Sequence, residues 1–215
     1  NGRVITSPAL NVNHNDKITI DGKLLPAREP ARLWRYYKSR GLVVSDRDEQ
    51  NRETIFDRLP QNLPRLITVG RLDLDSEGLL LMTNDGDLAR YLELPSTGWS
   101  RNYRIRAKGQ IDQAKLTALA NGVTIEGIRY GQVIAKLDRQ MASNAWLTIA
   151  IREGKNREIR RIMDYLGHKV SRLIRISYGP FQLGNLQDGD IKAVNARVLA
   201  DQLGTVSYTH LRAHE

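Results

Sequence analysis

Hydrophobic and polar residues alternate over many short stretches of this chain, a period of two that is typical of half-buried β-strands. In the stretch 103–108, for example, Tyr103, Ile105 and Ala107 share one side, and every residue between and after them is basic. Strands are predicted over Leu33–Lys38, 41–45, Arg65–Val69, Leu79–Thr83, Tyr103–Lys108, Trp146–Arg152 and Val170–Ser177. The pattern therefore predicts a chain rich in β structure.

Helical spacing interrupts this alternation in a few places. Apolar residues recur at that spacing in two segments, as Leu116, Leu119 and Ala120 and as Ile159, Ile162, Met163 and Leu166. We predict helices over 112–122 and over 157–166, the second capped by Asn156, and a short helix over 87–94 capped by Asp87. Helices set among many strands predict an α+β fold with a mixed, largely antiparallel sheet and flanking helices.

The ends of the chain differ from its centre. Residues 1–25 show short strands and a turn at Asp21-Gly22, and the proline-bounded segment 26–32 is predicted to be a linker to a larger unit over 33–204. We expect the chain to be a fragment that begins inside a motif, because it starts without methionine. The segment 205–215 resembles a non-native tail, so His210 and His214 are left out of any site.

The composition excludes several classes of protein. The chain has no cysteine, which excludes disulfides and thiolate chemistry and favours a reducing cytoplasm. No run of about 18 apolar residues occurs, so no membrane span is expected. His14 and His168 are isolated, no phosphate-loop or dinucleotide-binding motif is present, and neither a metal nor a cofactor is expected.

Charge points to a polyanionic partner. The formal net charge is +9, and clustered lysines and arginines supply most nonspecific affinity for nucleic acid. The basic residues gather in 101–108 and in 152–175. A solvated basic surface is the plain alternative.

One carboxylate, Asp73, lies between Leu72 and Leu74, and a charge among apolar residues is costly unless it is paired. It could cap a turn and pair with Arg71. With Asp75 it also resembles the start of a calcium loop, but Asn84 stands where the loop needs a glutamate. A magnesium-dependent phosphohydrolase that uses both aspartates is a third reading.

Two further features leave alternatives open. Tyr103 belongs either to the core or to a surface that stacks on an unpaired base. Arg157 and Arg161, one helical turn apart, either form a solvated face or contact phosphates, while Arg160 either lies at the edge of that face or turns into a cleft and pairs with a carboxylate.

Three segments together resemble the RsuA/RluB family of bacterial ribosomal RNA pseudouridine synthases. They are 70–89 (GRLDLDSEGLLLMTNDGDLA), 101–109 (RNYRIRAKG) and 152–179 (REGKNREIRRIMDYLGHKVSRLIRISYG). The likeness is greatest to the RluB-type branch, which modifies large-subunit rRNA, although Asp75 stands where asparagine or another polar residue is more usual. The resemblance implies that 1–25 is the remnant of an S4-like RNA-binding module before a catalytic domain.

The resemblance also implies roles for single residues. Asp73 matches the catalytic aspartate, Tyr103 the tyrosine that stacks on the target base, and Arg160 the basic residue that pairs with the aspartate. The residues expected to contact substrate are Arg71, Leu173, Arg157, Arg161, Arg104, Arg106, Lys155 and Arg172. The implied activity is isomerisation of a uridine in rRNA, favouring 23S rRNA, by a cytoplasmic monomer that flips the base out and needs no cofactor. A non-catalytic rRNA-binding or ribosome-assembly protein is the alternative.

Overall fold

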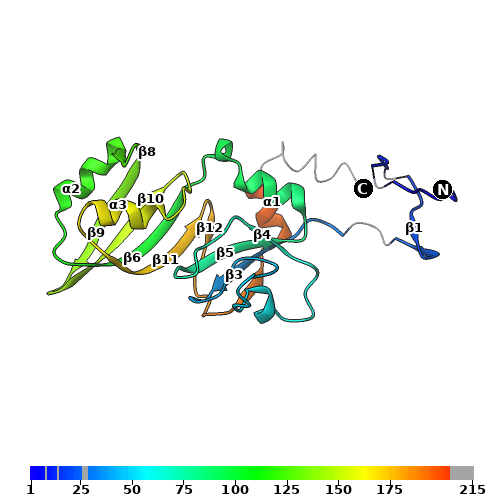
Figure 1. Cartoon of the computed structure of the whole chain (residues 1–215), viewed down its shortest axis with the longest axis horizontal. Helices are drawn as coiled ribbons and strands as arrows, with labels where there is room; N and C mark the ends of the chain where they lie inside the picture. The colour runs from blue at the N-terminus through cyan, green and yellow to red at the C-terminus, as the bar shows by residue number, and fades with distance from the viewer. Residues whose placement is uncertain (8, 14, 26–28, 204–215) are drawn as a thin grey trace.

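The computed structural model describes residues 1–7, 9–13, 15–25 and 29–203. Its main body is a nine-stranded mixed sheet, and the predicted α+β class is confirmed. Figure 1 shows helices packed against this sheet. The strands of this sheet are β3 (Leu33–Lys38), β4 (Ile67–Val69), β5 (Glu77–Thr83), β6 (Arg101–Lys108), β9 (Val133–Gln140), β10 (Asn144–Ile151), β11 (Val170–Tyr178), β12 (Phe181–Gln182) and β13 (Ile191–Ala193). Two separate hairpins are β1 (Thr19–Ile20) with β2 (Lys23–Leu24) and β7 (Val123–Ile125) with β8 (Ile128–Tyr130).

The sheet is built from two halves that meet at one short parallel pair. The strand order is β13-β3-β5-β11-β6-β10-β9, and β4 adds to β5 as β12 adds to β11. All pairings are antiparallel except β5 with β11, which align only Ile174 with Glu77 and Arg175 with Gly78. Beyond that pair the loop before β5 and the start of β11 separate.

Glycine at position 78 permits this junction. A Cβ on Gly78 would lie 2.5 Å from the carbonyl oxygen of Arg175, and the residue has φ +101°. No other amino acid tolerates both the close approach and that backbone conformation without strain. Gly78 therefore lets the two halves of the sheet join.

Two apolar cores lie on opposite faces of the sheet. Leu80 and Met82 of β5 point into one core and Leu79 and Leu81 into the other, as the alternation of a strand requires. Helices α2 (Gln113–Ala118) and α3 (Glu158–Tyr165) cover the first core over β6, β9 and β10, and Figure 1 shows them beside those strands. Helix α1 (Gly86–Glu93) and a helix over 196–203 cover the second core beneath β3, β4 and β5.

Most predicted elements are present, and some boundaries were wrong. The segment 41–45 makes only a single bridge between Val43 and Thr54 and is not a strand. Asp85, not Asp87, caps α1, because Gly86 is the first helical residue and the Asp85 carboxylate accepts from the Leu88 N–H. Asn156 is not a cap either, since Arg157 holds that position in a left-handed conformation.

The structure tests only some of the predictions made for the two ends of the chain. The turn predicted at Asp21-Gly22 is present, and both residues have positive φ, as a tight hairpin turn requires. Figure 1 shows this hairpin away from the main body. The predicted tail 205–215 lies outside the described residues. Within the described ranges, no helix has both the length and the apolarity to cross a membrane.

Candidate active site

A cavity of about 370 Å³ lies where the two halves of the sheet separate. It is bounded by the loop before β5, by β6 and β11, and by the segment that leads into α3. Of the residues singled out in the sequence, seven line it: Arg71, Asp73, Tyr103, Lys155, Arg157, Arg160 and Leu173. Segments distant in sequence thus meet at one cavity.

Asp73 lies in the turn that leads from β4 into β5. The Ser76 N–H donates to its carbonyl oxygen at 3.0 Å, which closes the turn and fixes the backbone. The Asp73 side chain is 36% exposed, and its nearest ion-pair partner is Arg157, with 3.7 Å between Nη1 and Oδ2. The carboxylate is therefore accessible from the cavity and not sealed among leucines.

The expected pairing of Arg160 with Asp73 is replaced by a pairing with the next aspartate. Arg160 Nη2 lies 3.2 Å from Asp75 Oδ2 and donates to the Asp75 carbonyl oxygen, and Nη1 donates to Val170 O. Arg157 donates to both carboxylate oxygens of Asp75, at 3.1 and 3.4 Å. The reason is geometric. Arg160 spans the gap between β11 and the turn before β5, and Asp75 is the aspartate of that turn that lies next to the guanidinium group.

Asp75 therefore organises two arginines and is more than a loop residue. Partial burial raises its pKa, but the Arg157 hydrogen bonds and the charges of Arg160 and Arg157 outweigh this, and the net pKa is lowered. Arg157 keeps φ +51° at this point, which is unfavourable for a residue with a side chain. Its ion pairs with Asp73 and Asp75 help to hold that conformation.

Lys38 supports the turn that carries Asp73 and Asp75, a role that the sequence did not predict. The side chain at the end of β3 is fully buried, and Nζ donates to Ser76 O at 2.8 Å and to Ser39 O at 3.0 Å. Burial lowers the pKa of Lys38 to about 8, against the opposing effect of Asp73, Asp75 and Glu77. A strand-terminal lysine gives no sequence signal that it will be buried.

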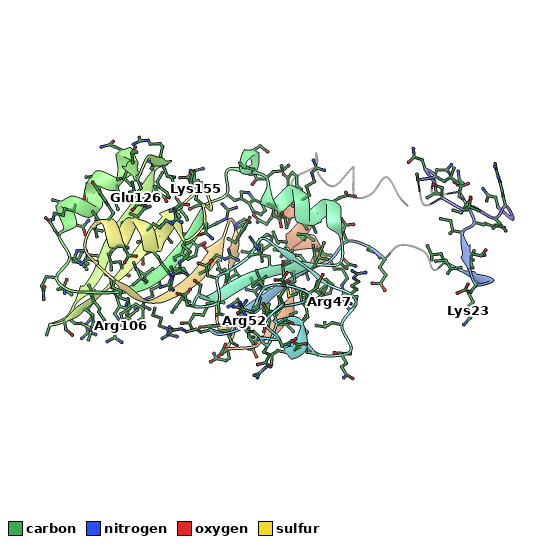
Figure 2. All side chains as sticks on the ribbon, viewed as in Figure 1. Lys23, Arg47, Arg52, Arg106, Glu126 and Lys155 are labelled. Carbon is green, nitrogen blue, oxygen red and sulfur yellow. The ribbon has the colours of Figure 1, made fainter. Side chains whose placement is uncertain are left out.

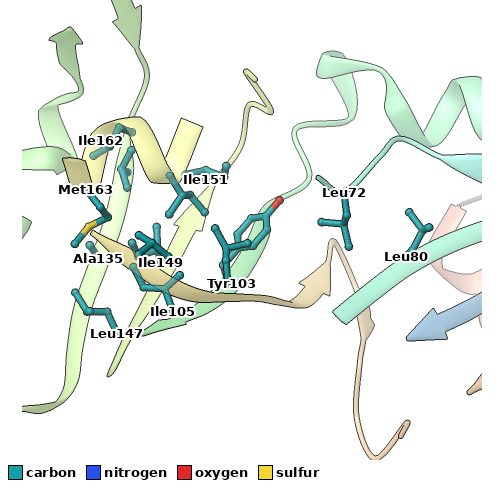
Figure 3. Packing of buried hydrophobic residues seen from close by; sticks show 14 of the residues in the cluster. Leu72, Leu80, Tyr103, Ile105, Ala135, Leu147, Ile149, Ile151, Ile162 and Met163 are labelled. Atoms are coloured by element: carbon teal, nitrogen blue, oxygen red, sulfur yellow. The ribbon is translucent and has the colours of Figure 1, made fainter. Parts of the chain in front are cut away.

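Tyr103 and Leu173 form the apolar wall of the cavity. They lie on the adjacent strands β6 and β11, where Leu173 is opposite Ile105 and Tyr103 is opposite Arg175, and both belong to the core that α3 covers. Tyr103 is only 7% exposed, and Figure 3 shows it between Ile105 and Leu72, with its hydroxyl directed toward the Leu72 segment. The residue is thus both a core residue and part of the cavity.

Glu158 is a second residue that the sequence did not reveal. It lines the cavity and is 3% exposed; Oε2 accepts from the Lys155 N–H, while Oε1 is buried without a hydrogen-bond partner. Burial raises the pKa of Glu158 to about 7, and the nearby Glu153 charge adds to the effect. Its carboxyl group holds the segment that enters α3.

Four residues expected to contact substrate lie outside the cavity lining: Arg161, Arg104, Arg106 and Arg172. Arg104 and Arg106 alternate with Tyr103 along β6, so they point to the opposite face of the sheet. There Arg104 lies over the Trp146 ring at 5.0 Å, and Arg172 pairs with Glu77. Figure 2 labels Arg106 and Lys155 on opposite sides of this part of the sheet.

The chemistry of this cavity is that of an accessible carboxylate among cations, next to an apolar wall. Such a site suits a flat, neutral ring attached to an anionic backbone. The Asp75 oxygens are engaged by guanidinium groups, and no group of three or more metal-ligating side chains occurs in the part of the chain that the structure describes.

Comparisons with known proteins show which family this chain belongs to. Residues 32–165 match the model of the RNA pseudouridylate synthase family. An uncharacterized RNA pseudouridine synthase of Rickettsia felis is 47% identical over 198 residues, which cover 92% of this chain and 86% of that protein. The ribosomal large subunit pseudouridine synthase B of Escherichia coli K12 is 42% identical over 186 residues, covering 84% of this chain and 62% of the relative.

A solved structure shows the same architecture. A crystal structure of a pseudouridylate synthase superposes with a TM-score of 0.72 and 25% identity, covering 95% of this chain and 87% of that one. The family match spans the turn with Asp73, the strand with Tyr103 and the helix with Arg160. This chain belongs to the RNA pseudouridylate synthase family, and it is an isomerase.

Proposed function

We propose that this protein converts a uridine of ribosomal RNA into pseudouridine, with Asp73 as the catalytic carboxylate. The substrate class follows the E. coli relative, whose name assigns it to the large ribosomal subunit. The observation that carries the residue assignment is the cavity, where Asp73 faces the Tyr103 and Leu173 wall across a space bordered by arginines.

The reaction is an isomerisation that this set of groups can serve. The bond between C1′ of the ribose and N1 of uracil breaks, the ring turns, and C1′ bonds to C5. The C5 proton leaves and N1 gains one, so no electron acceptor is needed. An ionised carboxylate acts at the sugar, either as nucleophile or as the base that removes a sugar proton.

Entry of the base requires that it leave the RNA stack. Extruding a nucleotide costs about a few kcal/mol. A contact between the uracil ring and Tyr103 would offset part of that cost, since stacking on an aromatic ring contributes roughly 1–3 kcal/mol per base. Leu173 would close the other part of the apolar wall, and Arg71 and Lys155 would meet the phosphates.

The test follows the hydrogen that leaves C5. An unmodified transcript of bacterial large-subunit rRNA that carries tritium at C5 of uridine should release tritium with the wild-type protein. Asp73→Asn should lower this release at least about a thousandfold, because the reaction loses its nucleophile or base, while RNA binding persists. Asp46→Asn, the same change at an exposed loop residue, serves as the control.

Two outcomes would contradict the proposal. Undiminished release by Asp73→Asn would remove the residue from catalysis. Tight binding by the wild type without any release, on every rRNA tested, would favour a protein that only binds rRNA.

A further inference from the structure

A second cavity, of about 400 Å³, lies on the other side of the Asp75, Arg157 and Arg160 cluster. Arg157 and Arg160 line both cavities and form part of the wall between them, while Asp75 lines only the second. The other residues that line it come from the loop after β3, the end of β6, the last turn of α3, and the segment that leads into β11 together with its start. The cationic ones are Arg40, Lys108 and Lys169.

The charges of this second cavity do not cancel. Five cations line it against two carboxylates, Asp75 and Asp164. Asp75 is already paired with Arg157 and Arg160. No ion pair joins Arg40, Lys108 or Lys169 to a carboxylate among the residues that the structure describes. An anion in this cavity would therefore meet three cations that have no ion-pair partner among the described residues.

Arg160, in the wall between the two cavities, also favours an anion in the second cavity. Arg160 is 10% exposed at its side chain, and its Nε is buried without a hydrogen-bond partner. Its neighbours Arg157 and Arg40 add positive charge, which together with burial lowers the pKa of Arg160. An anion placed beside this cluster would reduce the repulsion between the cations.

We propose that the second cavity is a phosphate subsite, which binds a backbone phosphodiester of the same RNA whose uridine enters the first cavity. This proposal rests on the proposed function for its choice of RNA. A phosphodiester fits because arginine and lysine are the usual partners of phosphate oxygens. Since Arg157 and Arg160 line both cavities, a phosphate bound in the subsite would lie next to the cavity that holds Asp73.

The test neutralises the subsite without touching the first cavity. Arg40→Gln/Lys169→Gln removes two exposed cations that line only the second cavity. As a control, Lys136→Gln/Arg139→Gln also removes one lysine and one arginine charge, at exposed positions of β9, a strand that lines neither cavity. Binding to the unmodified large-subunit rRNA transcript is measured by filter retention between 50 and 300 mM KCl, chosen to span roughly physiological ionic strength.

We expect Arg40→Gln/Lys169→Gln to bind roughly tenfold more weakly at the lowest salt and to reduce the slope of log affinity against log salt by about one. The control pair should change the affinity less than about threefold. KM for tritium release should rise with kcat nearly unchanged, because Asp73 keeps its surroundings. Equal losses in both double variants would overturn the subsite and leave only a general effect of net charge.

A second measurement identifies the anion. Single methylphosphonate replacements along the transcript should weaken binding to the wild type at one position near the target uridine, and Arg40→Gln/Lys169→Gln should be insensitive at that position. The proposal would be wrong if inorganic phosphate bound to the wild type and not to Arg40→Gln/Lys169→Gln, while both proteins bound RNA equally well. The cavity would then hold a free anion. If the wild type released no tritium but the RNA-binding differences were as expected, only the proposed function would be rejected.

Discussion

At the scale of single residues, the candidate site is a balance of charges. Asp73 and Asp75 face Arg157 and Arg160, and the ammonium group of Lys38 lies beneath the turn that carries the aspartates. Arg160 is largely buried and has an ion-pair partner only in Asp75 among the described residues. Asp75 thus pairs with both arginines, while the Asp73 side chain stays 36% exposed.

Asp75→Asn should therefore destabilise the protein. The change leaves Arg160 buried without a counter-charge, and because the Asp75 side chain is 33% exposed, the loss should be roughly 1–2 kcal/mol, less than for a fully buried pair. Urea unfolding at pH 7 measures it. Since the pKa of Asp75 is lowered in the folded state, the stabilisation is present above its unfolded pKa and disappears in acid, where the two proteins should converge.

Asp46→Asn is the matched control for that experiment, and it should leave the unfolding midpoint within error. An Asp75→Asn protein as stable as the wild type at neutral pH would show that the Arg160 pairing contributes nothing.

Glu158→Gln should change how stability depends on pH. The folded pKa of about 7 exceeds the reference value of 4.5, so the folded state keeps a proton that the unfolded state releases. Wild-type stability is then lost as pH rises through this window. The glutamine variant lacks this loss, and relative to the wild type it should gain roughly 2–3 kcal/mol between pH 4 and pH 8.

Unfolding in urea at pH 4, 6 and 8 follows this difference, with Glu49→Gln on an exposed loop as the control. A constant difference between Glu158→Gln and the wild type across the range would mean that folding does not raise the pKa of Glu158.

At the scale of elements, the site depends on the short parallel pairing of β5 with β11. Gly78→Ala would place a methyl group 2.5 Å from the Arg175 carbonyl oxygen at φ +101°. We expect a loss of at least about 2 kcal/mol in the free energy of unfolding. Activity should fall even where the protein stays folded, since this junction sets the distance between Asp73 and Tyr103.

Gly86→Ala is the contrasting change. Gly86 starts α1, a Cβ there meets nothing within 4 Å, and its backbone is compatible with alanine. It should be neutral or stabilise by roughly 0.5–1 kcal/mol. Equal effects of the two glycine changes in thermal and urea unfolding would contradict the role given to Gly78.

The sequence predicted elements better than it predicted how they meet. The alternation in 103–108 and the helical spacing of Ile159, Ile162 and Met163 identify β6 and α3, because burial of one face imposes those periods. It did not identify β9, where polar residues interrupt the pattern on an exposed edge strand. Nor could it show that Arg160 would reach Asp75, since that pairing depends on where β5 and β11 separate.

At the scale of the whole molecule, positive charge lies on both faces of the sheet, but only one face carries the candidate site. The net charge of +9 gives a general attraction to RNA. Over β6, β9 and β10, the face without helices exposes Arg104 and Arg106. Alternation along a strand separates the two faces but does not show which of them bears the site, so the sequence alone could not separate these two arginines from the cavity residues.

The final prediction separates the two faces. Arg71→Gln, at the cavity, should raise KM for tritium release roughly three- to tenfold, since the variant loses a charged contact with the RNA. Arg104→Gln removes the same charge from the opposite face and should leave KM within about twofold, although losing the Trp146 contact should cost about 0.5–1 kcal/mol of stability. Steady-state kinetics at fixed ionic strength compare them. Equal rises in KM would mean that the RNA wraps around both faces of the sheet, and the substrate path would then include the exposed strands as well as the cavity.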